Sequence, residues 1–178
     1  GGSVVAARIP SQAAAPVPAA AQATGAPADS ALPRACESAA QRAFDFWLGH
    51  WTVHAADGRI AGRSRITRVS DGCAVLEEWS GAGGQNGTSL NFYDDELGEW
   101  VQVWAGGGGV VLRLRGGPVD GVMVMEGAGE RETPQGVVLD RIRWTPNDDG
   151  SVLQEWLISS DGGASWSTLF AGVYRPAG

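Results

Sequence analysis

Residues 44–51 read F-D-F-W-L-G-H-W, and this stretch decides how the rest of the chain is interpreted. Just before and within it, four residues recur with the spacing of one helix face: Cys36, Ala40, Phe44 and Trp47. Pro33 suits the first turn of such a helix, and Gly49 suits its end. The stretch therefore predicts a short helix that stops at Gly49 and a first strand that begins at Trp51.

After Gly49 the chain consists of short β-rich runs separated by turn sequences. Ten runs are expected to be strands: 51–56, 59–69, 74–80, 88–94, 100–105, 110–115, 122–126, 137–144, 152–159 and 169–175. The breaks carry hairpin sequences such as D-G, G-G-G-G and P-N-D-D-G, and none offers a crossover helix. The expected fold is therefore all-β, a ten-stranded antiparallel up-and-down barrel with a short N-terminal helix at its closed end.

The chain has two parts that differ in amino-acid composition. Residues 1–32 are almost entirely Ala, Pro, Gln, Ser, Thr, Gly and Val, which predicts a flexible leader, whereas 33–178 are expected to form the barrel domain. Such a leader is common behind a cleaved signal peptide. Cys36 and Cys73 show no C-x-x-C metal spacing, so they read as one disulfide in an exported protein or as two free buried thiols. A periplasmic or secreted location is the expectation.

The net charge and the spacing of the histidines reduce the classes of partner that the protein is expected to bind. The net charge is -7, which argues against nucleic acid and anionic membranes, and no apolar run approaches the ~18 residues of a membrane span. If Trp51 points inward, His50 and His54 point outward and lie about 13 Å apart along the strand, too far to share a metal. The sequence therefore predicts a small-molecule ligand, with no metal and no cofactor.

A polar residue stands two positions before an aromatic one on four expected strands: Glu77-x-Trp79, Asn91-x-Tyr93, Gln102-x-Trp104 and Gln154-x-Trp156. Side chains alternate along a strand, so each pair shares a face, and Trp100 shares the face of Gln102. Facing inward, these side chains would wall a cavity for a small aromatic or amphipathic ligand, to which Arg141 or Arg143 could add a cation.

The opposite facing is the alternative. It would turn a set of apolar residues inward instead: Leu76, Leu90, Phe92, Val101, Val103, Leu153 and Leu157. Three tryptophans would then face water, which is unusual, so the tryptophan-inward facing is favoured. In that case the aliphatic outer face needs a cover, which predicts a homodimer interface.

An exported binding protein is the first functional hypothesis, with two alternatives. In an enzyme, burial among indoles would raise the pKa of Glu77 and make it a general base, with Tyr93 or an arginine as its acid or oxyanion partner. That arrangement would suit a cofactor-free isomerase, cyclase or lyase. In a structural or assembly protein, side chains would fill the barrel.

Gly49-His50-Trp51 resembles the Gly-x-Trp motif that opens the first strand of calycin barrels, the lipocalins and their relatives. The resemblance implies that Trp51 packs across the closed end and that Arg175, in V-Y-R-P, covers it as a cation on an aromatic face. The run S-S-D-G-G-A-S-W at 159–166 similarly matches the Asp-box of sialidase-like proteins, a hairpin device without a catalytic role.

More widely, residues 36–176 resemble a bacterial family of calycin-like proteins of unknown function. The motifs that carry this resemblance are F-D-F-W-L-G-H-W, G-C-A-V-L-E-E-W, S-L-N-F-Y-D, W-V-Q-V-W, R-I-R-W-T-P, S-S-D-G-G-A-S-W and Y-R-P. The more distant nitrobindin group, ten-stranded barrels that hold haem through a late histidine, implies haem binding. This chain has no histidine after His54, so haem is not expected.

Overall fold

The computed structural model describes residues 35–178, which belong to one compact unit; the predicted leader at 1–32 and Pro33 lie outside the described residues. The elements are α1 (Ala39–Arg42), η1 (Asp45–Trp47), β1 (Gly49–Ala55), β2 (Ile60–Val69), η2 (Ser70–Gly72), β3 (Ala74–Gly81), β4 (Asn86–Asp94), β5 (Glu99–Gly106), β6 (Val111–Val119), β7 (Val122–Gly127), β8 (Arg131–Thr133), β9 (Gly136–Pro146), β10 (Val152–Ser159) and β11 (Ser167–Pro176).

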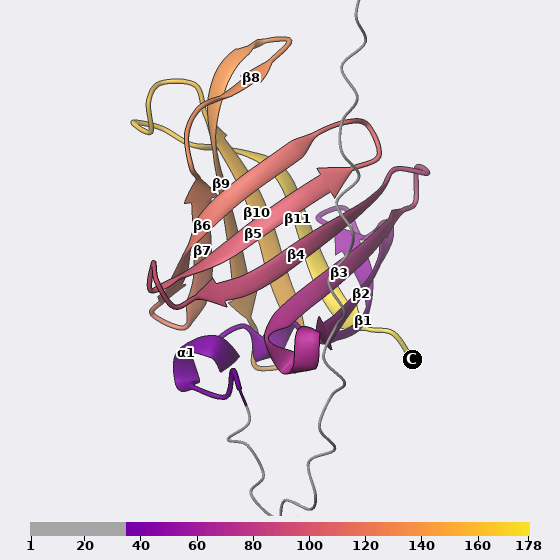
Figure 1. The fold of residues 1–178 in the computed structure, drawn as a ribbon. Coiled ribbons are helices and arrows are strands. Elements are labelled where there is room, and N and C mark those ends of the chain that lie inside the picture. Colours follow the sequence, from indigo (N-terminus) through magenta and orange to yellow (C-terminus); the bar gives the residue numbers. More distant parts are fainter. Residues whose placement is uncertain (1–34) are drawn as a thin grey trace, which may run out of the picture. The chain divides into compact units, whose positions relative to one another are not determined.

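Ten of these strands form a closed antiparallel barrel (Figure 1). Neighbours in sequence pair from β1 to β7, β7 pairs with β9, and β9 to β11 follow in order. The pairing of β11 with β1 completes the barrel. The predicted fold class is confirmed, and each of the ten predicted runs overlaps one barrel strand. The short strand β8 was not predicted; it pairs with β9 outside the barrel circuit.

The inward facing of the tryptophans is also confirmed. On β5, Trp100 and Gln102 are buried, whereas Val103 between Gln102 and Trp104 is 39% exposed. On β4, Asn91 is fully buried while its neighbour Leu90 is 41% exposed. Alternation therefore places the polar-x-aromatic pairs inside the barrel and the aliphatic residues outside.

Figure 1 shows α1 at one end of the barrel. Aromatic side chains plug that end. Phe44 stacks on Trp47 with ring centroids 4.7 Å apart, and it meets Trp100 and Trp144 edge-on at 5.5 and 5.1 Å. The indole N–H of Trp51 donates to the Trp47 carbonyl at 2.9 Å. The helix and first strand thus form the closed end, as predicted, although α1 itself has only four residues.

The helical segment is capped by its own residues and is held on the barrel by a disulfide and by polar contacts. Ser38 caps α1, accepting a hydrogen bond from the Gln41 backbone N–H in a capping box. Just before the cap, Cys36 forms a disulfide with Cys73, which follows the β2–β3 turn. Arg68 on β2 adds an ion pair to Asp45 in η1. The closed end is therefore fixed covalently as well as by packing.

Arg175 does not cover Trp51 as expected. On β11, Tyr174 is the buried, inward residue and meets the Trp51 ring edge-on at 6.3 Å. Alternation turns the next side chain, Arg175, to the outer face, where it is 54% exposed and lies 3.5 Å from the Asp149 carboxylate. Tyr174 takes the place against Trp51 that was assigned to the arginine.

The Asp-box hairpin joins β10 to β11 as predicted. The Asp161 carboxylate accepts from the Ser165 backbone N–H at 2.8 Å and from the hydroxyls of Ser159 and Ser165. These hydrogen bonds, that from the Ser165 hydroxyl above all, lower the pKa of Asp161 to about 2. Trp166 packs outside the barrel, with the Arg141 guanidinium 3.9 Å from its ring centroid.

Candidate functional site

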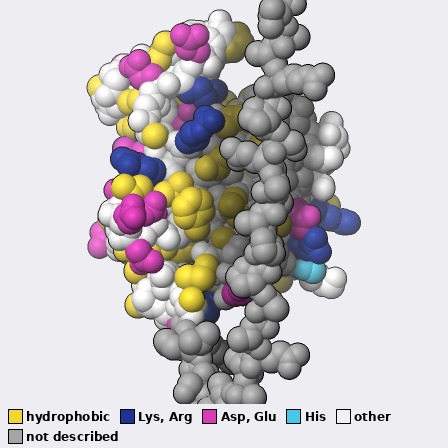
Figure 2. Space-filling view, viewed as in Figure 1, with side chains coloured by type: hydrophobic (Ala, Val, Ile, Leu, Met, Phe, Trp, Pro, Cys, Tyr) yellow, Lys and Arg dark blue, Asp and Glu magenta, His cyan; other side chains and the backbone are white. Residues whose placement is uncertain are grey.

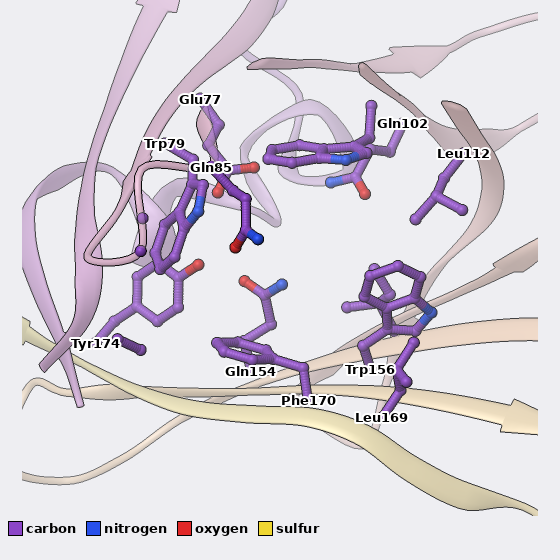
Figure 3. Close-up of a pocket in the computed structure, with 15 residues that line it drawn as sticks. Glu77, Trp79, Gln85, Gln102, Leu112, Gln154, Trp156, Leu169, Phe170 and Tyr174 are labelled. Carbon is purple, nitrogen blue, oxygen red and sulfur yellow. The ribbon is translucent and has the colours of Figure 1, made fainter. Parts of the chain in front are cut away.

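A cavity of about 370 Å³ occupies the barrel interior, away from the aromatic plug (Figure 3). Its lining residues are Ala61, Glu77, Trp79, Gly81, Gly83, Gln85, Gln102, Trp104, Leu112, Ile142, Gln154, Trp156, Leu169, Phe170 and Tyr174. The β3–β4 turn and the start of β11 supply part of this lining. The cavity therefore reaches the end of the barrel opposite α1, at the low end of the volume range of ligand pockets.

Glycines on neighbouring strands let two indoles lie flat against the barrel wall. A Cβ placed on Gly87 would stand 2.2 Å from the six-membered ring of Trp104. At Gly62 it would stand 2.6 Å from the ring of Trp79. Real side chains do not approach that closely, so only glycine permits these ring positions. The space that the rings would otherwise fill stays open as the cavity.

Glu77 is the acidic group of the cavity and is 96% buried, with 4% of its surface exposed. It receives hydrogen bonds from hydroxyls on three other strands. Ser89 on β4 donates to one carboxylate oxygen at 2.8 Å, and Ser64 on β2 donates to the other at 3.3 Å. The Tyr174 phenol on β11 also donates to the carboxylate. Ser64, Ser89 and Tyr174 each face the barrel interior, as Glu77 does, because side chains alternate between the two faces of each strand.

A chain of side-chain hydrogen bonds extends from Glu77 around the wall. Gln102 donates from its amide nitrogen to the Asn91 amide oxygen at 2.7 Å. Asn91 donates in turn to the Ser89 hydroxyl oxygen at 2.9 Å and to the Val75 carbonyl at 3.1 Å. Since Ser89 accepts from Asn91, its own proton is directed at Glu77. The chain therefore presents hydrogen-bond donors to Glu77, which suits an ionised carboxylate.

Burial dominates the acid–base properties of the Glu77 carboxyl group. Removal from water raises the pKa of Glu77 to about 7, against the opposing effect of the hydroxyl donors. Burial likewise raises the pKa of the Tyr174 phenol well above its usual range, and the neighbouring Glu77 adds to the shift. The carboxylate can thus exchange its proton near neutral pH, while the phenol stays protonated.

Six of the ten predicted ligand-binding residues line the cavity: Glu77, Trp79, Gln102, Trp104, Gln154 and Trp156. Asn91 lies behind the lining, in the hydrogen-bond chain. Trp100 and Tyr93 face inward but lie at the plugged end, where the Trp100 indole donates to the Ala40 carbonyl at 2.9 Å. Neither of these two aromatic residues lines the cavity.

Arg141 was expected in the lumen and lies on the outer face instead. On β9 the buried residues alternate from Val138 through Asp140 and Ile142 to Trp144, so Arg141 between two of them points outward. There its guanidinium lies 2.6 Å from the Glu126 carboxylate. Arg143, two residues further along β9, also points outward.

Among the lining residues that were not predicted, Tyr174, Phe170 and Gln85 add two aromatic rings and an amide to the cavity. Tyr174 and Phe170 alternate inward on β11, an expected strand whose facing follows from its aromatic residues. Gln85 lies in the β3–β4 turn, and Figure 3 shows its amide directed into the cavity beside Glu77, Gln154 and Tyr174. A turn residue has no alternation to reveal its direction, so Gln85 required the structure.

Trp156 is held at the cavity wall by the partly buried ion pair of Asp140 and Arg131. Its indole N–H donates to the Asp140 carboxylate at 2.8 Å. Arg131 on β8 donates to both oxygens of the same carboxylate, at 2.7 and 2.8 Å, and its guanidinium lies 5.7 Å from the centroid of the Trp156 ring. The short strand β8 therefore has a function in this region, since it supplies the cation that balances Asp140.

The described residues, 35–178, offer little for two other kinds of site. They contain no cluster of three or more His, Cys, Asp or Glu that could hold a metal ion. They also contain no helix that is both long and apolar enough to cross a membrane. No protein-family model matches the chain, and no curated protein is significantly similar to it.

Proposed function

We propose that this protein is an exported, calycin-like binding protein that holds a small aromatic or amphipathic molecule inside its barrel. The observation that carries the proposal is the cavity of about 370 Å³, walled by indole and phenyl rings and containing several polar groups. Apolar walls with a few convergent polar groups are typical of ligand pockets. The calycin-like assignment is supported by the closed ten-stranded barrel with a helix at its plugged end.

The polar groups that face the cavity leave hydrogen-bonding capacity for a ligand. Gln154 accepts from the Trp144 indole through its carbonyl oxygen at 3.1 Å, and its amide N–H groups remain directed into the cavity (Figure 3). Gln102 donates to Asn91, so its carbonyl oxygen remains an acceptor. Together with Glu77, these groups would fix the orientation of a ligand whose body lies between the rings.

The experiment uses N-phenyl-1-naphthylamine, a neutral aromatic probe whose fluorescence rises in apolar surroundings, followed by displacement with a metabolite collection. We expect binding to the wild-type protein and loss of binding in Trp104→Ala, since Trp104 walls the cavity. Trp166→Ala is the matched control, because this indole packs outside the barrel on Arg141. The binding function is disproved if neither the probe nor any metabolite changes fluorescence or melting temperature.

An enzyme is the second candidate, and the pairing of Glu77 with Tyr174 favours it. A carboxyl whose pKa is about 7 suits a general base at neutral pH, and a protonated phenol beside it could donate to a developing oxyanion. The expected acid partner, Tyr93, lies at the plugged end, and Tyr174 would take its role. In a cofactor-free isomerase, cyclase or lyase, Glu77→Gln would abolish turnover while far-UV circular dichroism stays unchanged.

Export is proposed on the disulfide together with the composition of residues 1–32. Disulfides persist in oxidising compartments such as the periplasm, and Cys36 and Cys73 form one here. The test is thiol alkylation of the protein in cells of its source, followed by fractionation. Unmodified cysteines in a periplasmic or secreted fraction are expected, whereas alkylated cysteines in the cytoplasmic fraction would contradict export.

The homodimer stays a prediction. The outer face of the barrel does expose aliphatic side chains, among them Leu90, Val103 and Val111, each about two-fifths exposed. Figure 2 shows hydrophobic side chains on this face between charged groups. Leu90 and Val103 are direct cross-strand partners, so they form one continuous apolar surface that a second copy could cover.

A further inference from the structure

The charged side chains that line the cavity are of one sign, negative. Of the described residues that line it, Glu77 is the one carboxylate, and none is lysine, arginine or histidine. The guanidinium of Arg131, which lies over the Trp156 ring, is already bound by both oxygens of Asp140. A ligand that enters therefore meets one acidic group and no free cation among the lining residues.

The surroundings of Glu77 are built for its ionised form but supply no counter-ion. Its partners among the described residues are three neutral hydroxyls, those of Ser64, Ser89 and Tyr174. The hydrogen bonds from Gln102 through Asn91 to Ser89 fix the direction of the donor at 2.8 Å. A buried carboxylate without an opposite charge is costly, and a cation within reach would remove much of that cost.

The walls suit a cation as well. The cavity is lined by the rings of Trp79, Trp104, Trp156, Phe170 and Tyr174. The face of an aromatic ring is electronegative and attracts organic cations, most strongly where water is excluded. Figure 3 shows the rings of Trp79, Trp156, Phe170 and Tyr174 around the space into which the amides project. Rings and a single carboxylate together form the kind of site that binds protonated nitrogen.

We infer that the ligand is an organic cation, with a protonated amine that binds Glu77 and an aromatic or apolar body that lies between the indole rings. This inference rests on the proposed binding function and narrows its ligand class. The remaining carbonyl oxygen of Gln102 can accept a second N–H from the same nitrogen, or one from the ligand body. An anionic ligand would instead meet the charge of Glu77 at close range and be excluded.

The test uses three probes that differ only at one end: 2-phenylethylamine, 2-phenylethanol and 3-phenylpropionate, with the corresponding indolyl and naphthyl sets to cover larger bodies. Isothermal titration calorimetry at about pH 8 is expected to show the amine binding on the order of tenfold more tightly than the alcohol, with the carboxylate weakest. Glu77→Gln should remove the difference between amine and alcohol. Glu78→Gln should keep it, because Glu78 points outward and pairs with Arg65.

The pH dependence gives a second readout that needs no variant. The groups that face Glu77 from β2, β4 and β11 are Ser64, Ser89 and Tyr174, none of which titrates near neutrality. Amine affinity should therefore rise between about pH 6 and pH 8 as Glu77 ionises, and alcohol affinity should stay level or fall. Binding of the amine should also release protons near pH 7, seen as a dependence of the heat on the buffer.

The outcomes separate this inference from the proposed function. If alcohols or carboxylates bind as tightly as the matched amines, or if N-phenyl-1-naphthylamine binds and no amine displaces it, the cation inference is overturned while ligand binding stands. If neither that neutral probe nor any member of the three sets binds, the proposed function fails and the inference falls with it.

Discussion

Gly87→Ala tests whether glycine keeps the cavity open. The added Cβ would lie 2.2 Å from two ring atoms of Trp104, so the indole must leave the wall and move toward the lumen. Overpacking of this kind costs about 1–3 kcal/mol, whereas replacing glycine by alanine at a compatible site gains about 0.4–1 kcal/mol from the unfolded state. We expect a net loss of about 0.5–2 kcal/mol in the free energy of unfolding, together with weaker binding of N-phenyl-1-naphthylamine.

Gly108→Ala is the matched control, since a Cβ at Gly108 meets no atom within 4 Å and its backbone is not in the left-handed region. This variant should be unchanged or up to about 1 kcal/mol more stable. Urea unfolding gives the free energy of unfolding of both variants. The same Gly87→Ala change made in a Trp104→Leu background measures the energetic coupling between positions 87 and 104. The cost of Gly87→Ala should shrink there by about 1 kcal/mol or more. Equal stabilities for the two alanine variants, or an undiminished cost without the indole, would refute the reasoning.

Three further predictions concern stability and assembly. Replacing Cys36 and Cys73 by serine opens a link that spans 37 residues and should lower the free energy of unfolding by about 4 kcal/mol in urea. Glu77 holds its proton up to about pH 7 in the fold, against 4.5 ordinarily, so its stabilising contribution is full below pH 4.5 and is lost as pH rises to 7. The wild type should therefore lose roughly 3 kcal/mol relative to Glu77→Gln across that window. Leu90→Asp should shift a dimer to monomer in sedimentation velocity.

Each of these has its own control. Reducing agent should reproduce the loss in the wild type and leave the serine variant unaffected. Glu78→Gln should follow the wild-type pH profile, and a Glu77→Gln profile parallel to it would contradict the burial cost. Leu97→Asp, in the β4–β5 turn away from the Leu90 surface, should leave the sedimentation coefficient unchanged. A wild-type monomer at high concentration would contradict the dimer.

Much of the fold was predictable because two local rules reinforce each other. The stop at Gly49 and the glycine-rich turns fix where elements begin and end, and the preference of tryptophan for burial fixes which face of each strand points inward. Glu77, Gln102 and Gln154 then follow their tryptophans into the lumen by alternation alone. These residues were placed correctly without any knowledge of which strands are neighbours.

Depth along the barrel axis could not be predicted in the same way. Trp100 and Trp104 share a face of β5, but they are separated by four residues, about 13 Å along a strand. One therefore lies in the plug and the other in the cavity. Which is which depends on how far neighbouring strands are staggered, and the stagger is set by pairing across the whole barrel. Tyr93 was misplaced for the same reason.

Arg175 and β8 show two other features that local sequence patterns do not predict. Tyr174 and Arg175 are adjacent, so one must point inward and the other outward, and the family resemblance favoured the arginine although burial favours the phenol. Strand β8 has three residues, Arg131–Thr133, too few to show alternation. Its role became clear only from the contact of Arg131 with Asp140, a pairing of distant charges that no local pattern contains.

Closure of the sheet has a consequence for how copies of this chain can associate. Each strand in the ten-stranded circuit has a hydrogen-bonded neighbour on both sides, so the barrel offers no backbone edge for strand addition. Within residues 35–178, β8 is the strand with one free side, and it carries the exposed charge of Glu132. Copies of the barrel can therefore associate through side-chain surfaces but not through strand pairing, and we expect a single charged substitution on such a surface to reverse that association.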